Sequence, residues 1–552
     1  MSHQWISAAL LAPVIGFAQP AETATPGKDL RLTYVSSIDQ TEQPYRVYVP
    51  SSYDGQRPIP CVIAMHGTGG NESSLFEDKR IPPDTFRRVA EKHGVLMVSP
   101  LGRGTTEYRG IGENDIFCVL ADIRKRYRID AERVYLTGQS MGGTGASYLA
   151  LHHPHLFAAV APLAPAYSFP WLAANLKHVP SWWIQGAKDA GFYLVGAGVG
   201  IDRMRQLGVP VKRDLIPGEE HPAGLQRIDE VVAWLVGHQR VSHPREYVFE
   251  VDTPLHGRAY WTAVDAIAEP GKMASVRARA EGPQRVRLDL ENVASLAFFP
   301  DALVFDPAKP LAVVVNQTEA YSGMLPSDRQ LRLVASGKTW KAAVEPRQDE
   351  DLTAYRTHPV AVAPAALDNR GTESLLANWI TDAMRDATGA DIAIYNRMHD
   401  RGLGIPQGTV DIADLIQCSR PFDQYLVTVR LTGRDLLEIL DANAAEAKRP
   451  AGQPPVQPAS RLVQISGARY TFDPSRPAGQ RIVSSNLDPA RSYTVAMEGQ
   501  VVERETVLLA GRFRKLEYKY TNTAFTLALY GYAAKLKKIE ARAEDRVRQV
   551  GR

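Results

Sequence analysis

The sequence predicts an α/β protein of several domains, and three observations lead to this prediction. Short apolar runs alternate with helical patterns through the first half of the chain, as in a parallel sheet covered by helices on both faces. One of these runs, Val134 to Leu136, enters Gly138-Gln-Ser-Met-Gly142, after which small residues open a helix. A chain of 552 residues is also too long for one hydrophobic core, so two to four domains are expected.

The predicted sheet occupies residues 25–243. Two alternating runs, Arg31 to Val35 and Tyr45 to Val49, are typical of antiparallel strands. Continuous apolar runs, typical of buried parallel strands, follow at residues 59–65, 95–98, 134–136, 158–163, 182–184 and 212–216. Helical patterns lie between them at residues 115–127, 142–151 and 225–238.

The pattern changes after residue 243. Short alternating runs separated by turn residues favour a small β-sandwich over residues 244–346. Residues 347–360 are charged and irregular, which is typical of a linker. Residues 361–552 mix strands and helices, so a third, α/β region is expected, with a charged helical tail from Ala533 to Val550.

Composition excludes some partners and indicates a compartment. The formal net charge is +3 and no long Lys/Arg run occurs, so nucleic acid is not an expected partner. Residues 5–18 are apolar and precede small and polar residues, which predicts a signal peptide and leader over residues 1–24 and a secreted or periplasmic protein. No membrane insertion is expected once the leader is removed. Cys61, Cys118 and Cys418 are expected to be free thiols.

Ser140 is the candidate nucleophile. Glycines two residues to either side leave room for a sharp turn that lifts its hydroxyl to a helix N-terminus. A serine needs a base and an orienting acid, and Asp189 and His221 follow two later strands in the required order. Asp202 and Asp214 are alternatives to Asp189, but one lies in a helical pattern and the other within a strand.

Three further histidines follow the nucleophile helix directly. His152, His153 and His155 are too close to that helix to fold back onto Ser140, so they are expected to be surface or capping residues.

His66-Gly-Thr-Gly-Gly70 comes directly after a buried strand. The backbone N–H groups of Thr68 and Met141 are the predicted oxyanion hole. A phosphate-binding loop is not favoured, because no Gly-Lys-Ser/Thr follows. The predicted substrate contacts are His66, Gly67, Gln139 and Trp182. The aromatic residues that either line an acyl groove or belong to the core are Tyr167, Phe169, Trp171, Trp182 and Trp183.

These motifs together resemble the esterase branch of the α/β-hydrolases, which includes polyhydroxybutyrate depolymerase-like, feruloyl and acetyl-xylan esterases. The motifs that carry the resemblance are His66 to Gly70, Pro100 to Gly104, Arg133 to Gly143 and Gly186 to Asp189. It implies hydrolysis of small-molecule or polymeric carboxylic esters through an acyl-serine, with no metal or cofactor. Glu219 and Glu220, just before His221, depart from the commoner Gly-x-Gly-His pattern.

The C-terminal segment resembles the 5′-nucleotidase C-terminal domain. The carrying residues include Leu376 to Met384, Ile405 to Gly408, Leu431 to Gly433 and Gln464 to Thr471. That family pairs this domain with a metallophosphatase domain, whose dinuclear metal ligands are not recognisable here. The family's Asn-x-Gly-Gly-x-Arg loop lacks its glycines at Asn396 to Arg401, and its base-stacking aromatic loop has no counterpart in Gly499 to Gly511. An accessory or polymer-contacting role is therefore favoured over nucleotide binding.

The sequence thus predicts a serine carboxylesterase. Two alternatives stay open: a serine peptidase of the prolyl-oligopeptidase type, for whose propeller the N-terminal segment is too short, and a nucleoside- or carbohydrate-binding protein with a vestigial hydrolase. The sequence does not determine the oligomeric state.

Overall fold

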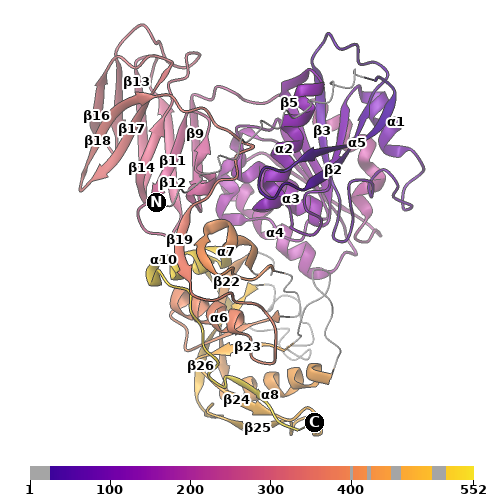
Figure 1. The fold of residues 1–552 in the computed structure, drawn as a ribbon, viewed down its shortest axis with the longest axis vertical. Coiled ribbons are helices and arrows are strands. Elements are labelled where there is room, and N and C mark those ends of the chain that lie inside the picture. The colour runs from indigo at the N-terminus through magenta and orange to yellow at the C-terminus, as the bar shows by residue number, and fades with distance from the viewer. Residues whose placement is uncertain (1–24, 398–401, 419–423, 449–461, 500–516, 552) are drawn as a thin grey trace, which may run out of the picture.

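The chain folds into three regions, each built on its own sheet or pair of sheets. The computed structural model describes residues 25–551, apart from residues 398–401, 419–423, 449–461 and 500–516. Figure 1 shows an α/β region at the upper right, a β region at the upper left and a mixed region beneath both. The predicted leader, residues 1–24, lies outside the described residues.

The first region is built on an eight-stranded sheet. In spatial order its strands are β1 (Lys28–Val35), β2 (Glu42–Val49), β4 (Leu96–Pro100), β3 (Ile59–Met65), β5 (Ile129–Gln139), β6 (Ala159–Leu163), β7 (Ser181–Gly186) and β8 (Val211–Ile216). The pairs β1–β2 and β2–β4 are antiparallel, and the pairs from β4 to β8 are parallel. All parallel strands therefore end at one edge of the sheet.

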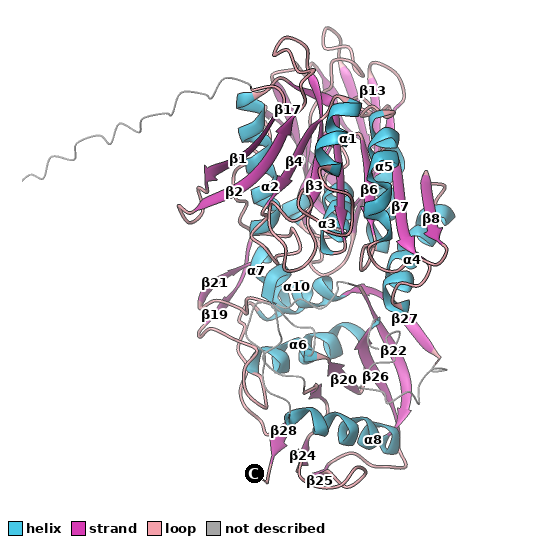
Figure 2. Ribbon diagram, turned by 90° about the vertical axis from the view of Figure 1, so that its right-hand side faces the viewer, coloured by secondary structure: helices cyan, strands magenta, loops and turns pink. Residues whose placement is uncertain are grey.

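Helices cover both faces of this sheet (Figure 2). They are α1 (Thr85–His93), α2 (Ile111–Arg126), α3 (Met141–His152), α4 (Gly191–Gln206) and α5 (Ile228–Val236), with the 3₁₀ helices η1 (Pro170–His178) and η2 (Ala223–Arg227). Val62 of β3 packs into the core formed with α1 and α5, whereas Ile63 packs into the core formed with α2, α3 and α4. Every β3 residue is buried because successive side chains point to opposite, covered faces.

The second region consists of two five-stranded sheets. One contains β10 (Arg258–Ala259), β11 (Thr262–Ile267), β14 (Val293–Phe298), β17 (Arg329–Ser336) and β18 (Thr339–Pro346). The other contains β16 (Thr318–Gly323), β15 (Leu311–Val315), β13 (Arg285–Glu291), β12 (Ala274–Ala280) and β9 (Glu246–Val251). Their inner faces share one core around Trp261, Phe298 and Phe305. A turn at Tyr260, with φ of 49°, separates β10 from β11.

The third region has a five-stranded sheet between two helical layers. Its strands are β23 (Gln464–Ser466), β20 (Ile392–Tyr395), β26 (Ser492–Glu498), β22 (Tyr425–Thr432) and β27 (Tyr518–Ala524). The helices are α6 (Leu375–Thr388), α7 (Ile412–Cys418), α8 (Gly433–Ala444) and α10 (Phe525–Leu536), with η5 (Ala445–Lys448). Small sheets join β19 (Pro359–Ala363) to β21 (Gly408–Asp411), and β24 (Tyr470–Phe472) to β25 (Ile482–Ser485) and β28 (Val547–Gln549).

The predicted helical tail from Ala533 to Val550 is wrong. Helix α10 ends at Leu536, where Lys537 adopts a left-handed conformation. The chain beyond is extended, because Ile539 is buried and Val547 pairs with Tyr470 in the parallel β24–β28 ladder. Pairing with a strand distant in sequence therefore overrides the local helical pattern.

The three regions contact one another directly. The side chain of Asn175 in η1 bonds both the backbone N–H and the carbonyl of Glu250 in β9, at 2.7 and 2.9 Å. The rings of Trp171 and Tyr425 lie 5.3 Å apart, which joins the first region to the third.

The three cysteines are free thiols, as predicted. Within the described ranges, none of the helices is both long and apolar enough to cross a bilayer.

Candidate active site

Ser140 lies in a sharp turn between β5 and α3. Its backbone has φ of 58° and ψ of −114°, a conformation that L-residues rarely adopt. A Cβ atom on Gly138 or Gly142 would lie 2.7 or 2.1 Å from the carbonyl oxygen of Met65. The two glycines of the motif are therefore required because the turn presses against the end of β3.

His221 and Asp189 lie beside Ser140 at the same sheet edge. The Nε2 atom of His221 is 2.8 Å from the Ser140 Oγ, and its Nδ1 atom is 2.9 Å from Asp189 Oδ2. The Asp189 side chain is only 2% exposed, whereas that of His221 is 30% exposed. The three groups form a continuous hydrogen-bonded chain. Asp189 is its buried end, and Ser140 and His221 are partly exposed to solvent.

Several contacts hold these groups in place. The Ala190 N–H donates to Asp189 Oδ1 at 2.7 Å, and the Gln139 side-chain amide donates to the His221 carbonyl at 2.9 Å. The Tyr193 ring stacks on the imidazole of His221 at 4.6 Å. No motif in the sequence marks Tyr193 as part of this site.

The loop after β3 lies against the nucleophile. A Cβ atom on Gly67 would be 3.5 Å from Ser140 Cβ and 3.3 Å from the Gln139 carbonyl oxygen. Thr68 is exposed next to it, and Met141 begins α3. This arrangement is compatible with the predicted oxyanion hole, whose two N–H groups stay a prediction.

Three of the four predicted substrate contacts, His66, Gln139 and Trp182, have buried side chains. The His66 side chain is fully buried, with its ring nitrogens 2.8 and 2.9 Å from the carbonyl oxygens of Gly67 and Leu101, so it holds the loop. Trp182 is 2% exposed and packs edge-on against Trp234 of α5. Gln139 is also buried and contacts the backbone of His221. The core interpretation holds for the other aromatic candidates, Tyr167, Phe169, Trp171 and Trp183, which are all buried.

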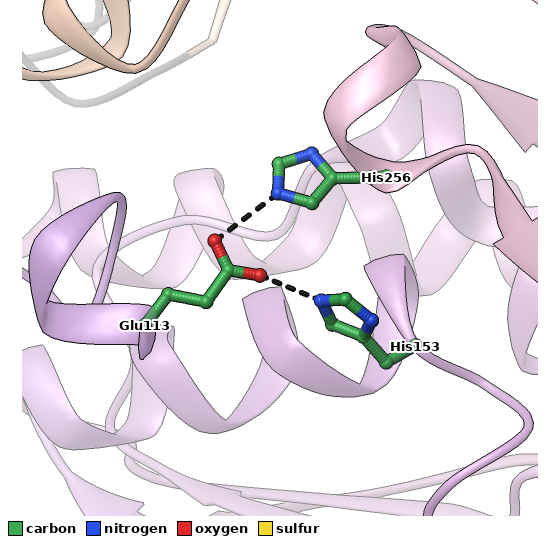
Figure 3. A group of neighbouring side chains, drawn as sticks. All are labelled: Glu113, His153 and His256. Atoms are coloured by element: carbon green, nitrogen blue, oxygen red, sulfur yellow. Dashed lines mark hydrogen bonds and ion pairs between the residues drawn. The ribbon is translucent and has the colours of Figure 1, made fainter. Parts of the chain in front are cut away.

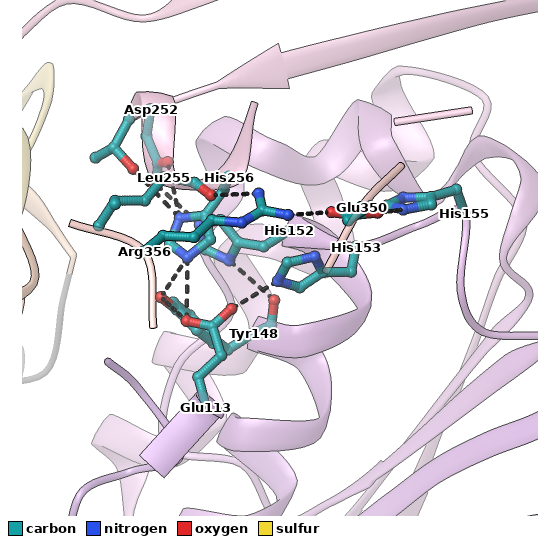
Figure 4. A network of polar contacts seen from close by, with 11 residues as sticks. Glu113, Tyr148, His152, His153, His155, Asp252, Leu255, His256, Glu350 and Arg356 are labelled. Atoms are coloured by element: carbon teal, nitrogen blue, oxygen red, sulfur yellow. Dashed lines mark hydrogen bonds and ion pairs between the residues drawn. The ribbon is translucent and has the colours of Figure 1, made fainter. Parts of the chain in front are cut away.

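His153 is the C-terminal cap of α3, which is one of the two alternatives predicted, but the prediction that His152, His153 and His155 lie at the surface is wrong. All three are buried, and each contacts a carboxylate (Figure 4): His152 contacts Asp252 at 3.0 Å, His153 contacts Glu113 at 2.6 Å and His155 contacts Glu350 at 2.9 Å. The β region and the linker cover this end of α3, which its own sequence does not reveal.

Burial and charge shift the pKa values in this cluster. Burial lowers the pKa of His153 to about 4 although Glu113 opposes the shift. Burial also acts to lower the pKa of His256, but the carboxylates of Glu113 and Asp252 outweigh it and raise the pKa to about 9. Burial acts to raise the pKa of Glu113, and the neighbouring imidazoles reverse this and hold it well below its usual range.

The strand order and the strand–Ser140–helix turn define an α/β-hydrolase domain. Residues 116–193 match the family described as putative esterase, and residues 355–503 match the 5′-nucleotidase C-terminal domain. The chain therefore joins an esterase-type domain to a nucleotidase-type C-terminal domain.

Curated proteins similar to this chain include feruloyl and acetylxylan esterases. Feruloyl esterase B of Neurospora crassa is 24% identical over 162 residues, which are 25% of this chain and 53% of the relative. Acetylxylan esterase A of Aspergillus oryzae is 25% identical over 125 residues, or 20% of this chain and 38% of the relative. The chain thus spans about half or less of the length of these relatives.

Solved structures similar to this chain include a ferulic acid esterase and a 5′-nucleotidase precursor. A ferulic acid esterase is 19% identical, with a TM-score of 0.34, and the match covers 39% of this chain and 99% of that one. A 5′-nucleotidase precursor from Thermus thermophilus is 23% identical, with a TM-score of 0.31, and the match covers 44% of this chain and 54% of that one.

The C-terminal domain retains the framework that carried its resemblance. Leu376 to Met384 lies in α6, and the buried Arg397 bonds the carbonyls of Asn369, Gly371 and Thr372. The rest of the Asn396 to Arg401 loop and residues 500–511 lie outside the described residues, so the predicted loss of nucleotide binding stays a prediction.

Proposed function

We propose that this chain is a serine carboxylesterase. The observation that carries the proposal is the hydrogen-bonded chain from Ser140 through His221 to Asp189, whose two links measure 2.8 and 2.9 Å. The esterase family match and the feruloyl and acetylxylan esterase relatives support the same reaction class.

Acylation begins when Ser140 Oγ attacks the ester carbonyl carbon. His221 Nε2 takes the hydroxyl proton, and the carbonyl oxygen becomes an oxyanion facing the N–H groups of Thr68 and Met141. The tetrahedral intermediate collapses as the C–O bond to the alcohol breaks, and the leaving alkoxide takes the proton from Nε2. An acyl-serine and a free alcohol result.

Deacylation repeats these steps with water. His221 removes a proton from water, the hydroxide adds to the acyl carbon, and the proton returns to Ser140 as the acid leaves. Asp189 accepts the Nδ1–H of His221 throughout, which fixes the ring tautomer and stabilises the transient imidazolium. No cofactor enters this sequence.

The substrates we propose are carboxylic esters of the feruloyl, acetyl or aliphatic polyester type. The first two follow from the names of the relatives, and all three from the esterase-branch motifs. Together with the leader predicted at residues 1–24, they favour an ester substrate outside the cytoplasm.

Hydrolysis of p-nitrophenyl esters of increasing acyl length, and of methyl ferulate, tests the proposal. Wild type is compared with Ser140→Ala and with Ser147→Ala, a matched control whose hydroxyl donates to the Thr144 carbonyl within α3. We expect turnover by wild type and the control and none above background by Ser140→Ala. Equal turnover by all three chains would refute the mechanism.

A further inference from the structure

A second cluster of chemically active side chains lies at the far end of α3 from Ser140. It joins Glu113 of α2, His152 and His153 at the end of α3, and Asp252 and His256 of the β region, the last in η3 (Pro254–His256). Figure 3 shows Glu113 between the imidazoles of His153 and His256, which approach it from two different regions. The catalytic proposal uses none of these residues.

The donor atoms of this cluster lie close enough together to hold one metal ion. One donor atom from each of Glu113, His153 and His256 lies within 4.8 Å of the others. Glu113 Oε1 is 2.6 Å from His153 Nε2, and Oε2 is 3.1 Å from His256 Nε2. Donors on a tetrahedral zinc ion are about 3.3 Å apart, given metal–ligand distances of about 2.0–2.1 Å. The Glu113–His153 contact would therefore need to lengthen by less than about 1 Å for both side chains to coordinate one zinc ion.

We propose that Glu113, His153 and His256 bind one divalent transition-metal ion, with Zn²⁺ the best fit. Two imidazoles and one carboxylate form a donor set that zinc uses, and they leave a fourth position open.

The remaining cluster residues orient this ligand set. Asp252 Oδ1 is 3.8 Å from His256 Nδ1, and Thr253 Oγ1 is 3.3 Å from the same nitrogen, while His256 Nε2 faces Glu113. Thr253 Oγ1 therefore holds the Nδ1 side of the imidazole while Nε2 faces Glu113, and outer contacts of this kind orient a histidine for coordination. His152 Nε2 contacts the other oxygen of Asp252 at 3.0 Å. We therefore assign His152 and Asp252 to the surroundings of the proposed metal site, and not to a second metal site.

Charge also favours a cation here. Glu113 and Asp252 place two carboxylates in a region where the side chains of Glu113 and His256 are 10% and 6% exposed. Buried carboxylates require positive charge beside them, and one divalent ion supplies two such charges.

A small cavity supplies the fourth ligand position. It has a volume of about 60 Å³ and is lined by Glu113, His153 and His256 together with Phe117 and Leu255. This space accommodates a water molecule. Arg356 also lines the cavity, but its guanidinium is bonded to Glu350 at 2.6 Å and to the Leu255 carbonyl at 3.2 Å.

The role of the ion is structural. Helix α3 separates His153 from Ser140 by roughly 18 Å at 1.5 Å per residue, too far for the ion to contact a substrate at the serine. Glu113 and His153 belong to the hydrolase, and His256 to the β region, so the ion crosslinks the two.

Zinc binding to the full chain tests this site independently of ester turnover. After treatment with EDTA, Zn²⁺ is titrated calorimetrically into wild type, Glu113→Gln, His153→Gln and His155→Gln. The last is a matched control, because His155 is also buried but contacts Glu350. We expect one equivalent to bind wild type and His155→Gln, and affinity to fall about 100-fold or more in the other two.

Binding of Co²⁺ gives a second readout that needs no variant. Visible absorption bands typical of tetrahedral cobalt in the wild type support the site even if Glu113→Gln fails to fold. The proposal is overturned if wild type binds neither ion, or if His153→Gln binds Zn²⁺ as tightly as wild type.

Discussion

The phenol ring of Tyr193 lies nearly parallel to the imidazole of His221, with ring centroids 4.6 Å apart and planes inclined by 25°. Tyr193 lies in the first turn of α4, and its ring covers a face of the imidazole that Asp189 and Ser140 do not contact. Since the hydrogen bonds to Asp189 and Ser140 fix only the edge of the ring, Tyr193 limits its tilt.

We expect Tyr193→Ala to lower kcat about fivefold, because an aromatic pair contributes about 1 kcal/mol beyond the area that it buries. Tyr193→Phe keeps the ring and should retain most of the wild-type rate. Steady-state kinetics with a p-nitrophenyl ester measure both. A Tyr193→Ala enzyme as fast as wild type would show that the stack does not orient the base.

Gly186 is the second position on which His221 depends. A Cβ atom there would lie 2.2 and 2.4 Å from the carbonyl oxygens of Glu220 and Glu219, in the loop that carries the histidine. We expect Gly186→Ala to displace this loop and lower kcat/KM about 100-fold, since a shift of about 1 Å costs that much.

Gly191→Ala is the matched control for this substitution. A Cβ atom at Gly191 meets nothing within 4 Å, and the residue lies in the first turn of α4. Kinetics and thermal melts of the two variants should differ, and equal rates would argue against crowding at Gly186.

Asp189→Asn should retain the fold and lose most of the activity. An amide cannot act as a pure acceptor for the Nδ1–H, so the imidazole tautomer is no longer fixed, and we expect kcat to fall about 10³- to 10⁴-fold. Burst kinetics with p-nitrophenyl acetate report the acylation step. A loss below about tenfold would mean that another group orients His221.

Stability near the N-terminus should depend on pH through Asp29. Burial acts to raise the pKa of this carboxyl, but hydrogen bonds from Arg46 and Arg87 reverse the shift and hold it below its ordinary value. A carboxyl with a lowered pKa in the folded state stabilises the fold above its unfolded pKa of about 3.9, and that stability is lost as pH falls through the folded value.

Asp29→Asn should therefore lower the free energy of unfolding by about 1 kcal/mol at neutral pH, a modest value because the group is partly exposed. The difference from wild type should shrink at pH of about 3 and below. Urea titrations at both pH values measure it. A deficit that is equally large in acid would contradict an ionic origin.

The local patterns of the sequence predict much of the hydrolase. The uninterrupted apolar run at Ile59–Met65 is a strand buried on both faces, and the chain order of Ser140, Asp189 and His221 anticipates their meeting at one sheet edge. Both inferences need only periodicity and the direction of parallel strands.

Long-range packing explains what the sequence does not reveal. His152 and His155 contact Asp252 and Glu350, which lie 100 and 195 residues further along the chain. Trp182 is a large aromatic residue of the kind that often contacts substrates, but it packs against Trp234 and belongs to the core. The chain beyond Leu536 is extended because of its pairing with β24.

The segment between β18 and β19 contacts all three regions of the chain. Glu350 pairs with His155 of the hydrolase, Arg356 bonds Leu255 of the β region, and the adjacent β19 pairs with β21. A gene fragment that ended before this segment would leave His155 buried without its carboxylate. We therefore expect recombination to transfer the α/β region with its stability intact only together with the sequence that follows.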